Sequence, residues 1–148
     1  MNWAYRRFHE LSVDELYDAL TLRSRVFVVE QNCVFLDADG ADCDSGHLLG
    51  RDEAGVLQAY LRIVDAGVKY AEPSIGRIVT SPETRGCGLG RLLVAEGLRQ
   101  CGIAFSGLPI RIGAQARLEG FYGGFGFVRD GADYIEDGIP HCEMVRPG

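Results

Sequence analysis

Three glycines at the start of one helix constrain the fold more than any other feature of this sequence. They occupy alternate positions in the string ETRGCGLGRLL, at Gly86, Gly88 and Gly90, between the apolar run SIGRIVT and a leucine-rich stretch. Glycine in a helix is about 1 kcal/mol less favourable than alanine, so its repetition here needs a local reason. The pattern predicts a strand, a turn and a helix whose first turn exposes bare backbone.

Bare backbone at a helix start is typical of an anion-binding loop. The first amide groups of a helix have no partner within it, and the helix dipole makes that end electropositive. Where side chains are missing, a phosphate can approach these amides closely. Arg85 and Arg91 add positive charge at the two ends of the loop. The segment is therefore predicted to bind phosphate groups.

Spacing excludes two common phosphate-binding motifs. A Walker A loop requires G-x-x-x-x-G-K-[ST], and no such string occurs. The dinucleotide fingerprint G-x-G-x-x-G fails from either start, because Arg91 and Leu93 stand where its last glycine is required. The string that does occur is R-x-x-G-x-G, which begins at Arg85 and ends at Gly90.

The composition is that of one globular domain, residues 1–148, with 47% hydrophobic and 24% charged residues. The formal net charge of −6 argues against a nucleic-acid partner. No apolar run reaches the roughly 20 residues that span a bilayer, and the first residues, MNWAYRRFHEL, lack the layout of a signal peptide. We therefore expect a cytoplasmic protein without a membrane partner. Five cysteines without a C-x-x-C pair indicate free thiols in a reducing compartment.

Acidic residues gather in two stretches of the chain. They are Asp37, Asp39, Asp42, Asp44, Asp52 and Glu53 in the first and Asp130, Asp133, Glu136 and Asp137 in the second. Two interpretations stay open: solvated loops, or a rim that attracts cations. A calcium-binding EF-hand starting at Asp37 is excluded, because Ala41 and Leu48 fall at ligand positions and the glycine is misplaced. No metal site is expected.

Hydrophobic periodicity predicts the order β-α-β-β-β-α-β-α-β-β, an α/β (α+β) domain. The first helix is predicted from about residue 12, with Ser12 and Glu15 as a capping box, towards residue 28. Strands are predicted at residues 3–8, 74–80 and 108–114, and two more within 47–64. A second helix is predicted to end near Gly102, a third within 116–126, and two final strands around a loop within 127–146.

Several strings together resemble the GNAT superfamily of acetyl-CoA-dependent N-acetyltransferases. They are RIVTSPETRGCGLGRLL at the glycine loop and GAQARLEGFYGGFGF at the later strand and helix. More narrowly, LRSRVFVVEQNC, DADGAD, IGRIV, GAQA and EDGIPH resemble the ElaA-like subfamily almost end to end. The resemblance implies a GNAT acyl-CoA N-acyltransferase fold, with a central mixed sheet of about six to seven strands flanked by helices. It also implies transfer of an acetyl group directly to a primary amine.

The resemblance implies a set of residues that bind acetyl-CoA. The strand before the loop would bind the pantetheine arm through its backbone, and the loop amides would bind the pyrophosphate. The matching positions are Ile78, Val79 and Thr80 on the strand and Arg85, Gly86, Cys87, Gly88, Leu89, Gly90 and Arg91 at the loop. Gln115 stands where many relatives have an asparagine, seven residues before Tyr122, and its longer amide could also reach the cofactor arm.

The resemblance also implies a catalytic acid, because Tyr122 matches the tyrosine that protonates the departing thiolate of CoA. Without it, FYGGFGF would be interpreted as a core aromatic cluster. A general base is needed because an alkyl ammonium, with a pKa of ~10.4, is only about one thousandth neutral near physiological pH. Glu30 and His141 are the candidates, and His47 is a weaker one. Each could instead make a structural hydrogen bond.

The acceptor is not specified by any motif. The acidic stretches mildly favour a small cationic amine, and a peptide end is also compatible with a short, polar loop between Glu30 and His47. A homodimer is possible, as in many members of the superfamily. The alternative function is a non-catalytic acyl-CoA-binding sensor that keeps the cofactor loop without turnover.

Overall fold

The computed structural model describes all residues, 1–148, and shows strands in two groups with helices packed around them. The first group holds β1 (Asn2–Arg7), β2 (Ser45–Arg51), β3 (Leu57–Val64) and β4 (Ser74–Thr80). The second group holds β5 (Ile110–Gln115), β6 (Val128–Arg129), β7 (Tyr134–Glu136) and β8 (Ile139–Arg146). The helices are α1 (Val13–Arg23), α2 (Leu89–Ala104) and α3 (Glu119–Gly123), with a π-helical segment, η2 (Ser24–Glu30), directly after α1.

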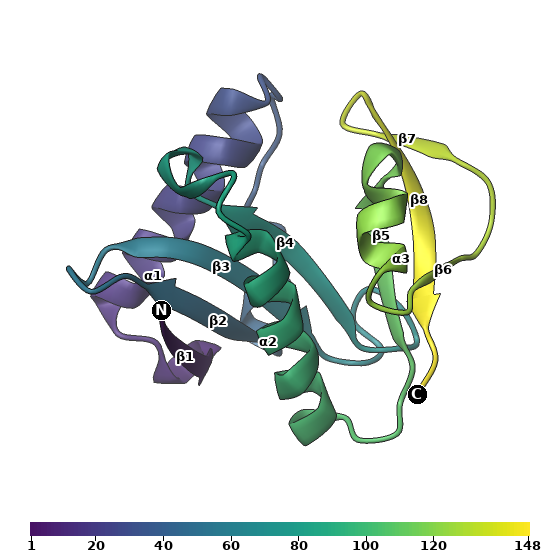
Figure 1. The fold of residues 1–148 in the computed structure, drawn as a ribbon, viewed down its shortest axis with the longest axis horizontal. Helices are drawn as coiled ribbons and strands as arrows, with labels where there is room; N and C mark the ends of the chain where they lie inside the picture. Colours follow the sequence, from purple (N-terminus) through teal and green to yellow (C-terminus); the bar gives the residue numbers. More distant parts are fainter.

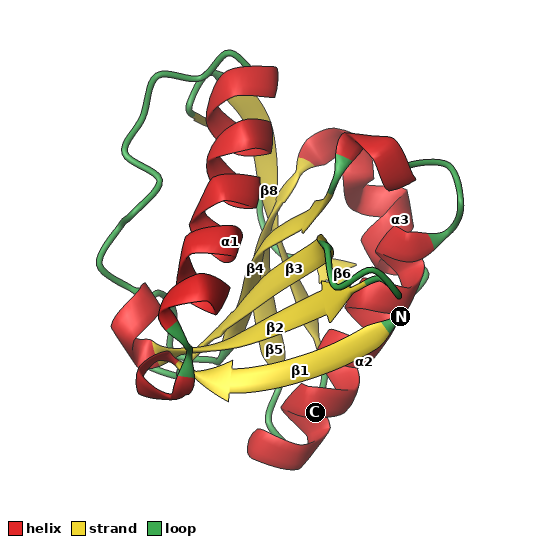
Figure 2. Cartoon of the chain, turned by 90° about the vertical axis from the view of Figure 1, so that its left-hand side faces the viewer, coloured by secondary structure: helices red, strands yellow, loops and turns green.

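The first sheet is antiparallel in the order β1-β2-β3-β4. Its two faces are covered by different helices, α1 on one side and α2 on the other (Figure 2). Ala19, Leu22 and Val26 pack against Tyr60 on the α1 face. On the α2 face, Gly97 lies so close to β3 that an added Cβ would be 2.7 Å from a Leu61 methyl group. Because helices cover both faces, the residues of β2 and β3 are almost continuously buried.

The two groups of strands separate between β4 and β5, as the two arms in Figure 1 show. A backbone hydrogen bond from Arg111 to Pro73, of 3.1 Å, joins their starts, but β4 and β5 do not pair as neighbours. In the second sheet, β8 lies between β5 and β6 and also pairs with β7. The fold class is thus the expected one, with eight strands that form two sheets where we expected one central sheet.

A β-bulge accounts for the way β4 leaves the plane of its neighbours. Tyr60 of β3 pairs with Val79, and Arg62 pairs with Gly76, so two residues of β4 face one residue of β3. One of the two, Arg77, has a φ of +50°, which is strained for a residue with a side chain. Bulges increase local twist and leave backbone groups unpaired. The bulge therefore opens the space beside β4 that the site uses.

Most elements lie where the sequence places them. The capping box of α1 is confirmed: Ser12 accepts from the Glu15 amide at 3.0 Å, and Glu15 accepts from the Ser12 amide at 2.8 Å. The helix that we expected to run on towards residue 28 changes to wider π-type turns at Ser24. The C-terminal segment holds three strands where two were predicted, because the two-residue β6 is too short to produce a periodicity signal.

None of the helices combines the length and apolar character that crossing a membrane requires.

Candidate active site

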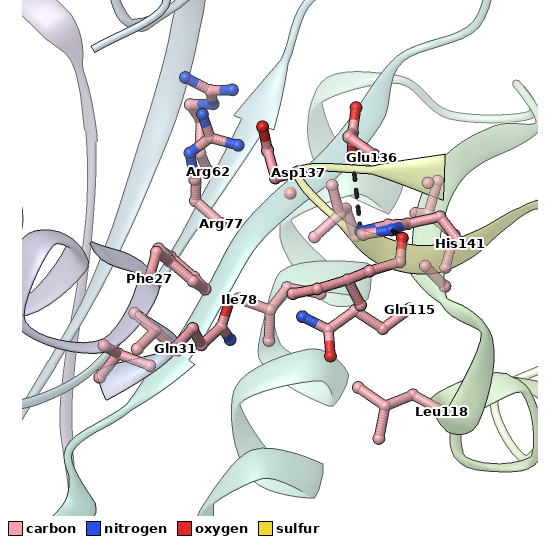
Figure 3. Close-up of a pocket in the computed structure, with 18 of the residues that line it drawn as sticks. Phe27, Gln31, Arg62, Arg77, Ile78, Gln115, Leu118, Glu136, Asp137 and His141 are labelled. Atoms are coloured by element: carbon pink, nitrogen blue, oxygen red, sulfur yellow. Dashed lines mark hydrogen bonds and ion pairs between the residues drawn. The ribbon is translucent and has the colours of Figure 1, made fainter. Parts of the chain in front are cut away.

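A cavity of about 510 Å³ lies where β4 and β5 diverge. One wall comes from β4 and from the neighbouring η2, which contributes Phe27. The other wall comes from β5, α3 and the hairpin of β7 and β8, which contributes His141. Figure 3 shows Phe27, Gln31 and Ile78 on one side of the cavity and Gln115, Leu118 and His141 on the other. The strands' divergence thus creates a cleft that two separate parts of the chain enclose.

The glycine loop lies at one end of this cavity and is open to solvent. Gly86 and Gly88 have φ values of +85° and +81°, a conformation that favours glycine. A Cβ added at either of them, or at Gly90, would meet nothing within 4 Å. The first backbone hydrogen bond of α2 runs from Leu92 to Gly88, and the six amides from Gly86 to Arg91 donate to no carbonyl of the loop. Unpaired amides around an open space fit a bound phosphate.

The edge of β4 that faces the cavity is free of backbone partners from β5. Val79 and Thr80 pair with β3 on their other side, and Ile78, Val79 and Thr80 all line the cavity. An open strand edge can hydrogen-bond an extended ligand as an added strand. The structure therefore leaves these positions accessible to a pantetheine arm, and the bulge at Arg77 provides further unpaired backbone next to Val79.

Tyr122 lines the cavity from α3 and is only 7% exposed. Its ring packs edge-on against Phe121 and Phe127, while its hydroxyl makes no hydrogen bond to the protein and is not sealed in the core. Burial raises the pKa of Tyr122 to about 12, which Arg117 opposes only in part. The phenol is thus protonated across the physiological range and can serve as a proton donor. The interpretation of FYGGFGF as a core aromatic cluster is confirmed, and the acid role of Tyr122, which also lines the cavity, stays a prediction.

Gln115 ends β5 and lines the cavity opposite β4. Its side-chain oxygen accepts from Arg117 at 3.1 Å, which leaves the amide group able to donate towards a ligand. The backbone of Gln115 is paired with His141 on β8, so the two side chains share one end of the second sheet.

His141 is held in one orientation by the hairpin of β7 and β8. Its Nδ1 lies 2.7 Å from the carbonyl oxygen of Ile139. Because a carbonyl can only accept, this nitrogen carries the proton and Nε2 has a free lone pair in the neutral ring. Glu136 places a carboxylate oxygen 3.5 Å from Nε2. This carboxylate is close enough to form an ion pair with the ring when Nε2 carries a proton.

Glu30 and Arg85 form an ion pair across the cavity mouth. The pair connects the end of η2 with the start of the glycine loop, so two residues expected in separate roles are in contact. Arg91, at the other end of the loop, stacks its guanidinium over the ring of Phe121 at 5.7 Å. The structure thus places Glu30 as a partner of the glycine loop, whereas His141 has a free nitrogen at the cavity.

Three members of the first acidic stretch, Asp37, Asp39 and Asp42, belong neither to a solvated loop nor to a cation-attracting rim, whereas Asp44 and Glu53 are exposed as solvated residues would be. Asp37 and Asp42 are buried, and Arg23, 1% exposed, donates to both at 2.8 Å. The remaining members of this cluster are Asp39, Arg62 and Arg77. Three arginines neutralise three aspartates, so both expectations were wrong for these residues. The cluster fixes the 37–42 segment to β3 and β4.

His47 belongs to the same buried region and does not line the cavity. Its Nδ1 lies 2.7 Å from the Tyr60 hydroxyl and its Nε2 lies 3.0 Å from the Asp42 carbonyl oxygen. Burial lowers the pKa of His47 and so favours the neutral ring. This histidine is structural.

All five cysteines are free, and no group of three or more His, Cys, Asp or Glu side chains could hold a metal ion.

Several cavity residues were missed by the sequence analysis. They are Phe27, Gln31, Arg62, Lys69, Tyr70, Arg77, Glu136 and Asp137. One signal was available: Arg62 and Arg77 lie inside the apolar runs YLRIV and SIGRIV, and a charged residue in a buried strand requires a partner. The identity of that partner depends on tertiary contacts, since Arg62 and Asp39 are 23 residues apart.

Comparisons with known proteins agree with this geometry. The family described as "Acetyltransferase (GNAT) domain" matches residues 44–146. Protein ElaA of Escherichia coli K12 is 42% identical over 150 residues, covering 99% of this chain and 96% of that protein. Its crystal structure superposes with a TM-score of 0.91 at 41% identity over 98% of both chains. A crystal structure of an acyl-CoA N-acyltransferase from Pseudomonas aeruginosa matches with a TM-score of 0.93 at 39% identity over 98% of both chains.

Proposed function

Since the chain belongs to the GNAT acetyltransferase family and has the acyl-CoA N-acyltransferase fold, we propose that it transfers an acetyl group from acetyl-CoA to a primary amine. The family membership supports acyltransferase activity with an acyl-CoA donor. The observation that carries the finer proposal is the row of unpaired amides from Gly86 to Arg91, within which Gly90 lines the same cavity as Tyr122. A donor bound at this loop would extend its arm along β4 towards that tyrosine.

The glycine loop and the open edge of β4 together support the donor site. The amides of Gly86 to Arg91 would bind the pyrophosphate, and Arg85 would add positive charge. The open edge of β4 at Ile78, Val79 and Thr80 would bind the pantetheine arm, with Gln115 on the facing strand. A backbone amide freed beside the bulge, near Val79, would stabilise the oxyanion that forms during acyl transfer.

The remaining chemistry is proton transfer. The neutral amine nitrogen attacks the thioester carbonyl, a C–N bond forms, the C–S bond breaks, and Tyr122 gives its proton to the departing sulfur. The acylated nitrogen loses its extra proton as the amide forms, and this proton restores the phenol of Tyr122. The raised pKa of Tyr122 suits this role, because the donor must remain protonated until the thiolate forms. We assign the removal of the ammonium proton to His141, whose Nε2 is free, rather than to Glu30, which is paired with Arg85.

We propose a small molecule or a peptide end as the acceptor, with a primary amine that arrives as a cationic ammonium group. The carboxylates of Glu136 and Asp137 line the cavity on the side of His141, and they favour a positive charge there. This support comes from the hairpin of β7 and β8, because the aspartates at 37–42 are neutralised within the fold.

The proposal is tested by incubating the protein with acetyl-CoA and a panel of primary amines. Free CoA thiol is measured with a thiol reagent, and the acetylated product is identified by mass. We expect amine-dependent thiol release that is matched by product, and its loss in Tyr122→Phe. Tight binding of acetyl-CoA without release on any amine would instead support the non-catalytic sensor. Failure to bind acetyl-CoA would refute both functions.

A further inference from the structure

Side chains of both charges line the cavity. The cations are Arg62, Lys69 and Arg77, here named the positive wall, and the anions are Glu136 and Asp137, here named the negative wall. Figure 3 shows Arg62 and Arg77 on one side of the cavity and Glu136 and His141 on the other. A simple amine would use only the negative wall, so the positive wall requires a separate explanation.

The positive wall has donors that the protein does not use. Arg77 donates to Asp37 and Asp39 through Nε and Nη2, but its Nη1 makes no hydrogen bond. Arg62 is 1% exposed, and its Nε is the buried side-chain atom in the structure that has no hydrogen-bond partner. Arg77 lines the cavity, so its Nη1 is the donor of this wall that can meet an acceptor arriving with a ligand.

Lys69 gives this wall its excess charge. The arginines Arg23, Arg62 and Arg77 are balanced by three aspartates, whereas Lys69, the only lysine of the chain, makes no ion pair or hydrogen bond. Lys69 lines the same cavity as Arg62 and Arg77. The turn that carries Lys69 is closed by a hydrogen bond from Gly67 to the Tyr70 carbonyl, of 2.7 Å.

We propose that the acceptor is an amino acid, a molecule that carries a carboxylate as well as the reactive amine. Its carboxylate binds Lys69 Nζ and Arg77 Nη1, and its ammonium group lies against Glu136 and His141. Two oppositely charged contacts fix both ends of the molecule and direct the amine towards the base. The inference rests on the proposed function, because it concerns the acceptor of the same transfer.

The test compares amino acids with the amines that remain when the carboxylate is removed. Matched pairs are alanine and ethylamine, phenylalanine and phenethylamine, tyrosine and tyramine, histidine and histamine, arginine and agmatine, and lysine and cadaverine. The measured quantity is kcat/KM for acetyl transfer at saturating acetyl-CoA. We expect the best amino acid to exceed its matched amine by about tenfold or more, the effect of one charge-assisted hydrogen bond.

Lys69 allows a clean variant, because it is exposed and outside the buried cluster. Lys69→Met should raise KM for the amino acid about tenfold and leave the matched amine unchanged, while Lys69→Arg should keep the preference. Arg99→Met is the matched control, since it removes one positive charge from the exposed face of α2, and it should change neither.

Two results would overturn the inference while acetyl transfer remains intact: amines preferred to amino acids, or an unchanged ratio in Lys69→Met. Bound acetyl-CoA with no transfer to any member of either series would also overturn it. Absence of acetyl-CoA binding by the native protein is a different outcome, because it removes the proposed function as well.

Discussion

Tyr122, His141 and Glu30 show how the environment of a side chain decides its role at the site. Tyr122 is enclosed by aromatic rings, so that burial raises its pKa to about 12 and keeps its proton in place. His141 is fixed through Nδ1 and keeps Nε2 free. Glu30 is engaged by Arg85. The acid and the two alternative bases that the sequence analysis names thus differ in what their surroundings allow them to do.

Replacing Tyr122 with phenylalanine should lower kcat by about a hundredfold, the usual size of a lost general acid. Because the hydroxyl has no hydrogen-bond partner in the protein, the fold and the affinity for acetyl-CoA should be unchanged. Steady-state kinetics and calorimetry measure the two effects. Tyr17→Phe, on the exposed face of α1, is the control and should be fully active.

The kinetics of two variants distinguish the candidates for the base. His141→Gln should lower kcat by about a hundredfold, because Nε2 is the group that accepts the proton. Glu30→Gln should keep kcat and change the binding of acetyl-CoA through Arg85. The pH profile of the native protein should show no fall from Tyr122 until pH approaches the pKa of this residue, about 12. A loss of kcat in Glu30→Gln alone would reverse the assignment.

At the scale of elements, the glycine loop and β4 show how backbone conformation makes a binding site. Two glycines in the left-handed region turn the chain into α2 and direct six amides into open space. On β4, the bulge at Arg77 separates the strand from β5. In both elements the backbone departs from regular geometry or regular hydrogen bonding at the point where the ligand would lie.

Replacing Gly90 distinguishes a role of the bare loop in ligand binding from a role in the stability of the fold. It lies within α2 without a left-handed φ, and an added Cβ would meet nothing. Gly90→Ala should therefore stabilise the protein by about 0.5–1 kcal/mol through helix propensity and weaken acetyl-CoA binding, because the methyl group enters the anion site. Thermal unfolding and calorimetry measure the two effects.

Gly102→Ala is the matched control for this variant. Gly102 is also in α2, with open space around it, but it lies far along the helix from the loop. It should give a similar gain in stability without loss of affinity. Unchanged binding in Gly90→Ala would mean that the loop is bare for structural reasons alone.

The parts of the structure that the sequence predicts are those with local causes. The capping box at Ser12 and the glycine loop each depend on residues within one turn of chain. The separation of β4 from β5 and the pairing of Arg62 with Asp39 depend on contacts between distant segments. The functional residues on β4 and at Tyr122 came from the family resemblance, because a short apolar strand and an aromatic cluster carry no functional signal by themselves.

At the scale of the whole molecule, the cluster of Arg23, Arg62 and Arg77 with three aspartates ties the acidic segment to the first sheet. Burial alone would raise the pKa of Asp42, but its bonds to Arg23 and Arg62 outweigh burial, and the pKa is lowered. The same balance lowers the pKa of Asp39, through Arg62 and the Ala41 amide. The cluster thus provides both a rigid wall for the cavity and a dependence of stability on pH.

Arg23→Met should lower the free energy of unfolding by about 3–5 kcal/mol, because it leaves buried carboxylates without their partner. Urea denaturation measures the loss. Arg25→Met, two residues away, removes an exposed arginine that pairs with Glu83 at the surface and should change stability little. Equal effects of the two variants would show that the cluster is not a stabilising unit.

Acid should destabilise the native protein through the same carboxylates. A carboxyl group with a lowered pKa in the folded state contributes stability above its unfolded pKa of ~3.9 and loses it as pH falls further. The free energy of unfolding should therefore decrease below about pH 4. The decrease should be smaller in Asp39→Asn, which has one such carboxyl group fewer, and an identical decrease in both proteins would contradict this origin.

The most direct test of the whole account is calorimetric titration of the native protein and of Gly88→Val with acetyl-CoA. Gly88 is the residue before α2 and has a φ of +81°, so valine would disturb the amides and fill the space in front of them. Circular dichroism would establish that the variant is folded. The account predicts binding in the micromolar range for the native protein and none for the folded variant. Absence of native binding, or equal binding by both proteins, would contradict the central claim that bare loop amides hold the acyl donor.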